Sequence, residues 1–167
     1  MANRSYFLSP TRFGHGLLMA GVGLLLGLTL QVQQASAQVS EIRTTPIGNL
    51  AMGGFDPVTY FEADAPAKGS DEFSYHWKGA RWLFTSQMNL EAFRANPETY
   101  APAYGGHGAW PVTVGQYVFG DPRLFTITDG RLFLHYTENT RDQWRADQAR
   151  LTERADRNWA TDLEQMR

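Results

Sequence analysis

Hydrophobic and polar residues alternate along two stretches of the chain, and each stretch is followed by a second apolar run. Residues 73–77 place an aromatic side chain at every second position, and residues 81–84 follow after a short turn. Residues 124–128 and 131–136 repeat this arrangement on either side of Asp129-Gly130. A period of two is typical of β-strands, and Asp-Gly between two such runs favours a type I′ turn. The pattern therefore predicts two β-hairpins.

Other stretches carry helix signals. Asp56-Pro57, Ser86 and Asn96-Pro97 have the residue types that begin helices, and the helix after Asn96 is expected to reach Tyr100. Thr140 begins a capping-box sequence, so a long helix is expected to follow it. Its apolar stripe is Trp144, Leu151, Ala155, Trp159 and Leu163. The arginines on its other faces, from Arg141 to Arg157, are expected to form a solvated surface with ion pairs.

Together these elements predict an α+β fold, with a small antiparallel sheet of two hairpins, short helices and a C-terminal amphipathic helix. Aromatic residues are frequent in the chain, which has 5 Trp, 7 Tyr and 10 Phe. Most of them fall after residue 38, where they can supply a core. The stretch 38–52 shows little pattern and is interpreted as a lead-in, followed by a domain at 53–167.

The first residues have the three parts of a secretory signal. Arg4 and Arg12 give a positive start, residues 16–30 form an uncharged apolar core, and Ala35-Ser36-Ala37 is a small-x-small cleavage site. The apolar core is shorter than the roughly 20 residues that span a bilayer. We therefore expect residues 1–37 to be removed and the protein to be periplasmic or secreted, with no membrane span afterwards. An uncleaved N-terminal membrane anchor is the alternative.

Composition excludes several classes of function. The chain has no cysteine, which removes disulfide exchange, a cysteine nucleophile, iron–sulfur clusters and any metal held by thiolates. Its formal charge is −2, and the loss of Arg4 and Arg12 with the signal would make it more acidic. Without a basic run, the sequence predicts no nucleic-acid partner. Phosphate-binding loops, dinucleotide fingerprints and the Gly-x-Ser-x-Gly nucleophile motif are also missing.

The glycine-rich segment at 104–110 is the main candidate site. It contains Tyr104, Gly105, Gly106, His107 and Trp110. Glycines let a backbone approach a ligand closely, and an imidazole between aromatic side chains can bind a metal ion or a small molecule. The alternative is a tight turn in which the histidine has no special role.

A metal site is a second hypothesis for the histidines. His76 and His135 lie on predicted strands, and if the two hairpins pair in one sheet, both can approach His107. Three histidines would suit Zn²⁺ or Cu²⁺. The spacings His-x-His, His-x-x-x-His and His-Glu-x-x-His are absent, so this hypothesis depends on the fold. The alternative is three histidines that are exposed or hydrogen-bonded separately.

An ordered set of short motifs runs through residues 53–159. In chain order they are Gly54-Phe55-Asp56-Pro57-Val58, Lys68-Gly69-Ser70, Trp77-x-Gly79-x-x-Trp82-x-Phe84, Asn96-Pro97-Glu98-x-Tyr100, Tyr104-Gly105-Gly106, Gly120-Asp121-Pro122, Asp129-Gly130 and Asn158-Trp159. Taken together, they resemble the YHS-domain family, and most of all its exported, single-domain branch. This resemblance implies a binding module.

The differences from the family concern its metal ligands. The metal-binding branch is a treble-clef module, and the resemblance implies that its cysteines align with Thr59, Thr85 and Asn89 here. The exported branch usually has a cysteine, and sometimes a selenocysteine, at the position that the resemblance aligns with Gly108. None of these residues supplies a thiolate, which speaks against the soft-metal and redox chemistry of the relatives.

The sequence therefore favours an exported, non-enzymatic module that binds a metal ion or a small ligand at the segment 104–110. The alternative is an interaction or structural domain, with a protein partner, that has lost the family's metal site. An enzyme with His107 as a general base ranks last, because no further catalytic residues accompany it.

Overall fold

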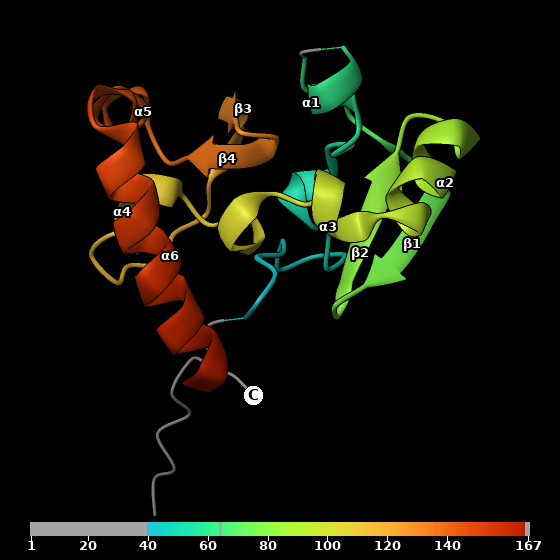
Figure 1. Ribbon diagram of the computed structural model, residues 1–167. Coiled ribbons are helices and arrows are strands. Elements are labelled where there is room, and N and C mark those ends of the chain that lie inside the picture. The colour runs from blue at the N-terminus through green and yellow to red at the C-terminus, as the bar shows by residue number, and fades with distance from the viewer. Residues whose placement is uncertain (1–39, 64, 166–167) are drawn as a thin grey trace, which may run out of the picture. The chain divides into compact units, whose positions relative to one another are not determined.

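The computed structural model describes residues 40–63 and 65–165. The expected signal segment and its cleavage site lie outside these residues. The described chain forms short helices around two hairpins, followed by two C-terminal helices (Figure 1). The predicted α+β class is confirmed. Within the described residues, no helix is both long and apolar enough to cross a membrane.

The first hairpin pairs β1 (Ser70–Trp77) with β2 (Ala80–Phe84). Lys78 and Gly79 both have positive φ, 46° and 72°, as a type I′ turn requires. A bulge interrupts the register between Ser70 and Ser74. On its other edge, β2 is covered by the lead-in, where Ala51 N donates to Arg81 O at 2.9 Å.

The second hairpin pairs β3 (Asp121–Thr128) with β4 (Arg131–His135). Asp129 and Gly130 have φ of 51° and 71°, so the predicted Asp-Gly turn is confirmed. Here too the outer edge is occupied, because Gly108 forms an isolated parallel bridge with Leu134.

The hairpins form two separate two-stranded sheets, whereas the sequence analysis placed them in one. Two of the hairpin edges are occupied by other segments. The lead-in lies along the outer edge of β2, and the glycine-rich segment lies along the outer edge of β4. β2 and β4 therefore cannot pair with each other.

Short helices connect the lead-in and the two hairpins. They are η1 (Met52–Gly54), α1 (Thr59–Glu62), α2 (Gln87–Ala95), α3 (Pro97–Tyr100), η2 (Ala103–Gly106) and α4 (Ala109–Val112). Ser86 caps α2 as predicted, and its side chain accepts from Asn89 N. Pro97 is the first residue of α3, also as predicted. The cap of α1 is Val58 rather than the expected Asp56, which has another role described below.

The predicted long C-terminal helix is two helices. α5 (Glu138–Ala146) begins one turn earlier than expected, since Thr137 is the cap and Thr140 is its reciprocal partner in the capping box. The chain leaves helical geometry at Asp147, with φ −149° and ψ 50°, and α6 (Gln148–Gln165) follows. The expected apolar stripe faces inward, with Trp144, Leu151 and Ala155 buried.

Aromatic side chains fill the interior. In the first cluster the Phe93 ring lies 4.9 Å from that of Trp82 and 5.2 Å from that of Phe84, and all three are fully buried. In the second, Phe133 and Trp144 lie 5.1 Å apart. Truncation of a buried Phe or Trp of this kind to Ala typically costs about 3–5 kcal/mol. A hydrophobic core, without disulfides, thus stabilises the fold.

Candidate functional site

The glycine-rich segment crosses directly against the lead-in. Tyr104, Gly105 and Gly106 have φ of 57°, 60° and 88°, a conformation that favours glycine. A Cβ on Gly105 would lie 1.7 Å from the carbonyl oxygen of Glu41. Arg43 N donates to Gly105 O at 2.8 Å. The close approach expected of these glycines is therefore made by another part of the chain.

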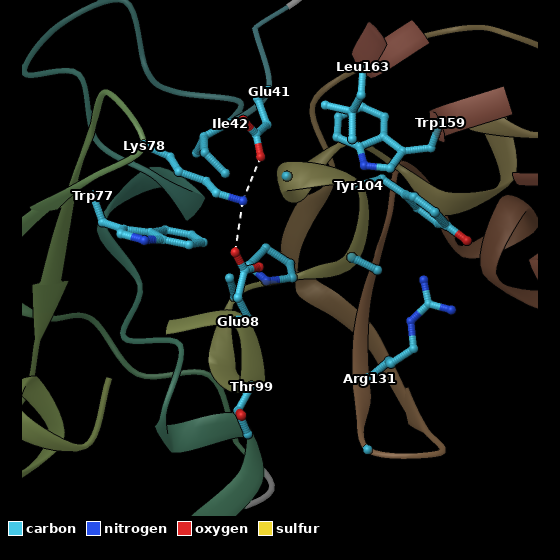
Figure 2. Close-up of a pocket in the computed structure, with 15 residues that line it drawn as sticks. Glu41, Ile42, Trp77, Lys78, Glu98, Thr99, Tyr104, Arg131, Trp159 and Leu163 are labelled. Carbon is cyan, nitrogen blue, oxygen red and sulfur yellow. Dashed lines mark ion pairs between the residues drawn. The ribbon is translucent and has the colours of Figure 1, made fainter. Parts of the chain in front are cut away.

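A pocket of about 260 Å³ lies beside this crossing (Figure 2). Tyr104 and Gly105, two residues of the candidate segment, form part of its wall. The other side chains come from the lead-in, both hairpin turns, α3 and α6. They include Glu41, Trp77, Lys78, Glu98, Thr99, Arg131, Trp159 and Leu163. Aromatic and charged groups therefore line one cavity.

Lys78 carries the positive charge on one side of the pocket. Its Nζ lies 2.6 Å from Glu41 Oε1 and 2.9 Å from Glu98 Oε1, as the dashed lines in Figure 2 show. Partial burial opposes its charge, but the bonds to both glutamates raise the pKa of Lys78 above its ordinary value. Its ammonium also lies 4.6 Å from the centre of the Trp77 ring.

A second polar group surrounds Tyr104. Its hydroxyl donates to Asp156 Oδ1 at 2.8 Å, and the Arg131 guanidinium bonds both oxygens of Asp156 at 2.8 and 3.0 Å. Partial burial opposes ionisation of Asp156, but the hydrogen bonds from Arg131 and Tyr104 hold its pKa below the ordinary value. Burial and the bond to Asp156 raise the pKa of Tyr104. This bidentate pairing fixes the guanidinium at the pocket wall.

Asp156 uses two of the five N–H donors of Arg131, and the arginine side chain remains 42% exposed. Its free donors can serve an acceptor in the pocket. The ring of Trp159 packs 6.0 Å from that of Tyr104. The arrangement can hold a small molecule that has an apolar body and an anionic or hydrogen-bonding end.

His107 lies outside this pocket, contrary to its expected central place. It is buried between the rings of Tyr117 and Trp159, with centroids at 5.3 and 5.8 Å. Nε2 lies 3.2 Å from Ser40 O, while Nδ1 is buried with no hydrogen-bond partner in the described residues. Burial lowers the pKa of His107, despite its backbone hydrogen bonds. The His107 imidazole is therefore a neutral group of the core.

Gly106 and Trp110, the other residues expected at the site, contact neighbouring segments of the fold and not the pocket. Gly106 O accepts from Gly120 N at 3.0 Å, which ties the segment to the start of β3. Trp110 is half-buried in α4 and packs against the second core cluster. Neither residue lines the pocket beside Tyr104.

The three histidines of the metal hypothesis lie in separate surroundings. His76 is exposed on β1, opposite Arg81. His135 is buried, with Nε2 3.0 Å from Thr126 Oγ1 and its ring next to Trp144. The part of the chain that the structure describes contains no group of three or more His, Asp or Glu side chains arranged to hold a metal ion.

Asp56 is the centre of a network that the sequence analysis missed. Its carboxylate is fully buried and accepts from Val58 N, Thr85 N, Thr85 Oγ1 and Asn89 Nδ2 at 2.7–2.9 Å. Thr59 Oγ1 donates to Asp56 O at 2.9 Å. Thr59, Thr85 and Asn89 are the positions at which the resemblance implies cysteine ligands. In this chain Thr85 and Asn89 donate to the Asp56 carboxylate, whereas Thr59 donates to the backbone carbonyl of the same residue.

The pocket residues Glu41, Lys78, Arg131 and Leu163 were also missed. They come from segments far apart in sequence. From the sequence alone, each is expected to be a surface charge or a residue on a helix face. The arrangement of the two hairpin turns beside α6 brings them together, and no local motif marks it.

A comparison with protein families matches the YHS domain to residues 61–104. This confirms the resemblance to the YHS-domain family over residues 61–104. No curated protein and no solved structure matches the chain. The match ends at Tyr104, so part of the pocket wall, from Gly105 to Leu163, lies beyond it.

Proposed function

We propose that this YHS-domain protein is a non-catalytic module that binds a small molecule in the pocket beside Tyr104 and Gly105. The observation that carries the proposal is the pocket itself, which is lined by the aromatic rings of Trp77, Tyr104 and Trp159 and by the charges of Lys78 and Arg131. A cavity of about 260 Å³ suits a ligand of one or two rings.

The ligand class follows from the free hydrogen-bonding capacity of the wall. Arg131 has N–H donors left after it binds Asp156, and Lys78 has a third donor after Glu41 and Glu98. Indole and phenol rings supply flat apolar surfaces. An aromatic carboxylate fits both features, with its ring against the aromatic walls and its carboxylate at Arg131.

A small molecule is a better occupant than a metal ion. His107 is buried away from the pocket, and the glutamates at the wall are paired with Lys78. In calorimetric titrations with Zn²⁺ and Cu²⁺, we expect no stoichiometric binding that depends on His107. His107→Ala should therefore titrate like the unmodified protein. Tight binding of either ion that is lost in this variant would favour the metal hypothesis.

A ligand-observed NMR screen with benzoate, phenylacetate and indole-3-carboxylate tests the proposal directly. We expect saturation transfer to at least one of these carboxylates and broadening of the Trp77 and Trp159 indole signals. If all three remain free at millimolar concentration, the proposal for this ligand class is wrong.

A structural or interaction domain is the second candidate. The Asp56 network favours it, because hydrogen bonds among Asp56, Thr85 and Asn89 hold the junction that the resemblance assigns to a metal. A protein that binds neither the carboxylates nor a metal ion, and that forms a stable complex with itself or a partner in sedimentation experiments, would support this reading.

A further inference from the structure

A second groove, of about 440 Å³, lies between β3 and α5. Its polar lining consists of Arg123, Thr126, Thr128, Arg141, Arg145 and Gln148. We call it the arginine groove. Every charged residue that lines it is an arginine, although the chain as a whole is slightly acidic. The expected solvated surface of α5 is therefore, at Arg141 and Arg145, the wall of a positively charged concavity.

The arginines of this groove are poorly neutralised. Arg123 Nη1 lies 3.8 Å from Asp121 Oδ1, and Arg141 Nε lies 3.9 Å from Asp142 Oδ1, both beyond hydrogen-bonding distance. Within the described residues, Arg145 has no carboxylate within 4.0 Å. By contrast, Arg131 is bound through two hydrogen bonds to Asp156.

Two donors at the groove are buried without an acceptor. Arg141 Nε and Gln148 Nε2 have no hydrogen-bond partner in the part of the chain that the structure describes. A buried donor left unpaired costs about 1–3 kcal/mol, and more when its group is charged. An acceptor in the groove that reaches either donor would recover this energy.

His135 lies behind the groove wall, and its pKa is affected by the charges of Arg141 and Arg145. Its Nε2 is 3.0 Å from the hydroxyl of Thr126, which lines the groove. Burial, together with the charges of Arg145 and Arg141, lowers the pKa of His135 to about 4. The positive field of the arginines thus reaches the protein interior at this point.

We propose that the arginine groove binds a phosphate group, either as inorganic phosphate or as the phosphoryl group of a small phosphomonoester. Guanidinium groups present paired N–H donors that match phosphate oxygens, and several of them around one concavity favour a dianion. Thr128 and Gln148 add neutral donors at the same wall. The groove has room for more than a phosphate ion, and Phe125 and Ile127 give it apolar sides.

The test is an NMR titration of the purified protein with inorganic phosphate and, separately, with glycerol 3-phosphate. Ionic strength is held constant with potassium chloride, and the His135 ring signals are followed. Saturable binding is expected, with an upward shift of the His135 pKa as the anion offsets Arg141 and Arg145. Arg145→Gln and Arg141→Gln should each weaken binding at least tenfold.

Arg150→Gln is the matched control. Arg150 is exposed on α6, does not line the groove and pairs with Asp147. This substitution should leave affinity unchanged. Arg145 is exposed, so its substitution keeps the test valid even if Arg141→Gln fails to fold. Tighter binding of glycerol 3-phosphate would identify a phosphomonoester, and binding of phosphate alone would identify the free ion. Absence of saturable binding, or equal loss in Arg150→Gln, would overturn the proposal.

Discussion

Gly105 shows how one residue can join two segments of the fold. Its φ of 60° and its 2.8 Å hydrogen bond to Arg43 fix the lead-in against the glycine-rich segment. The space in which a side chain would lie is filled by the Glu41 carbonyl, 1.7 Å from an ideal Cβ. The glycine signal in the sequence pointed to a close approach, but the chain itself, rather than a ligand, makes it.

Gly105→Ala is expected to destabilise the protein strongly. Gly79→Ala is the matched control, since Gly79 also has positive φ, 72°, but its Cβ would meet open space. The control should cost about 1–2 kcal/mol for conformation alone. The Gly105 variant should cost roughly 3 kcal/mol more, because Glu41 must move. Urea unfolding measures both, and equal losses would contradict this explanation.

His135 predicts a pH dependence of stability. Its pKa in the folded protein is about 4, below the ordinary 6.5, so the unfolded chain binds the proton first as pH falls. Stability should therefore decrease between pH 6.5 and pH 4, by about 3 kcal/mol from this residue. His135→Gln should flatten that part of the profile, which urea unfolding at a series of pH values measures; an unchanged slope would contradict this explanation.

At the scale of elements, local signals predicted what local interactions determine. The Asp129-Gly130 turn, the Ser86 cap and Pro97 at the start of α3 depend on a few adjacent residues, and the sequence analysis placed all of them correctly. The break at Asp147 was missed because the apolar spacing continues from Trp144 to Leu151 across it. The separation of the sheets was missed because it depends on segments that show no strand pattern.

The Asp56 network joins three elements, α1, β2 and α2. Its carboxylate holds the start of α1 through Val58, the end of β2 through Thr85, and α2 through Asn89. The sequence pattern predicted Asp56 as a helix cap, but the cap of α1 is Val58, whose N–H donates to the Asp56 carboxylate. The other contacts span about thirty residues of chain, so a local pattern cannot reveal them.

Asp56→Asn should destabilise the domain because an amide replaces one acceptor with a donor that faces other donors. The expected loss is about 2–4 kcal/mol. Asp142→Asn, at a site 69% exposed, is the control and should change stability by less than about 0.5 kcal/mol. Denaturant unfolding of the two variants measures both changes in the free energy of unfolding. A small effect of Asp56→Asn would mean that the network contributes little to stability.

At the scale of the whole molecule, the pocket depends on how distant parts come together. Glu41, Lys78, Glu98 and Arg131 are separated along the chain and carry no shared motif. The sequence pattern pointed only to the Tyr104–Gly105 part of this wall. The metal hypothesis depended on the same long-range arrangement, and the fold leaves His76 exposed on β1 while His107 and His135 are buried in separate surroundings.

Export of the protein is a prediction from the first 37 residues. Expression of the whole chain in a bacterium should give a periplasmic form whose N-terminal residue is Gln38. N-terminal sequencing of that form tests it. Recovery of the uncleaved chain in the membrane fraction would favour the N-terminal anchor instead.

The most direct test of the proposed function is to fill the pocket. Thr99 lies on its wall and is exposed, so Thr99→Trp places an indole in the cavity without entering the core. Thr161→Trp, at an exposed position of α6, is the matched control. Both variants are titrated calorimetrically with the aromatic carboxylate that binds most tightly to the unmodified protein. We expect Thr99→Trp to lower affinity at least tenfold and Thr161→Trp to leave it unchanged. Equal affinity in both variants would show that the ligand binds elsewhere and that the pocket beside Tyr104 is not the functional site.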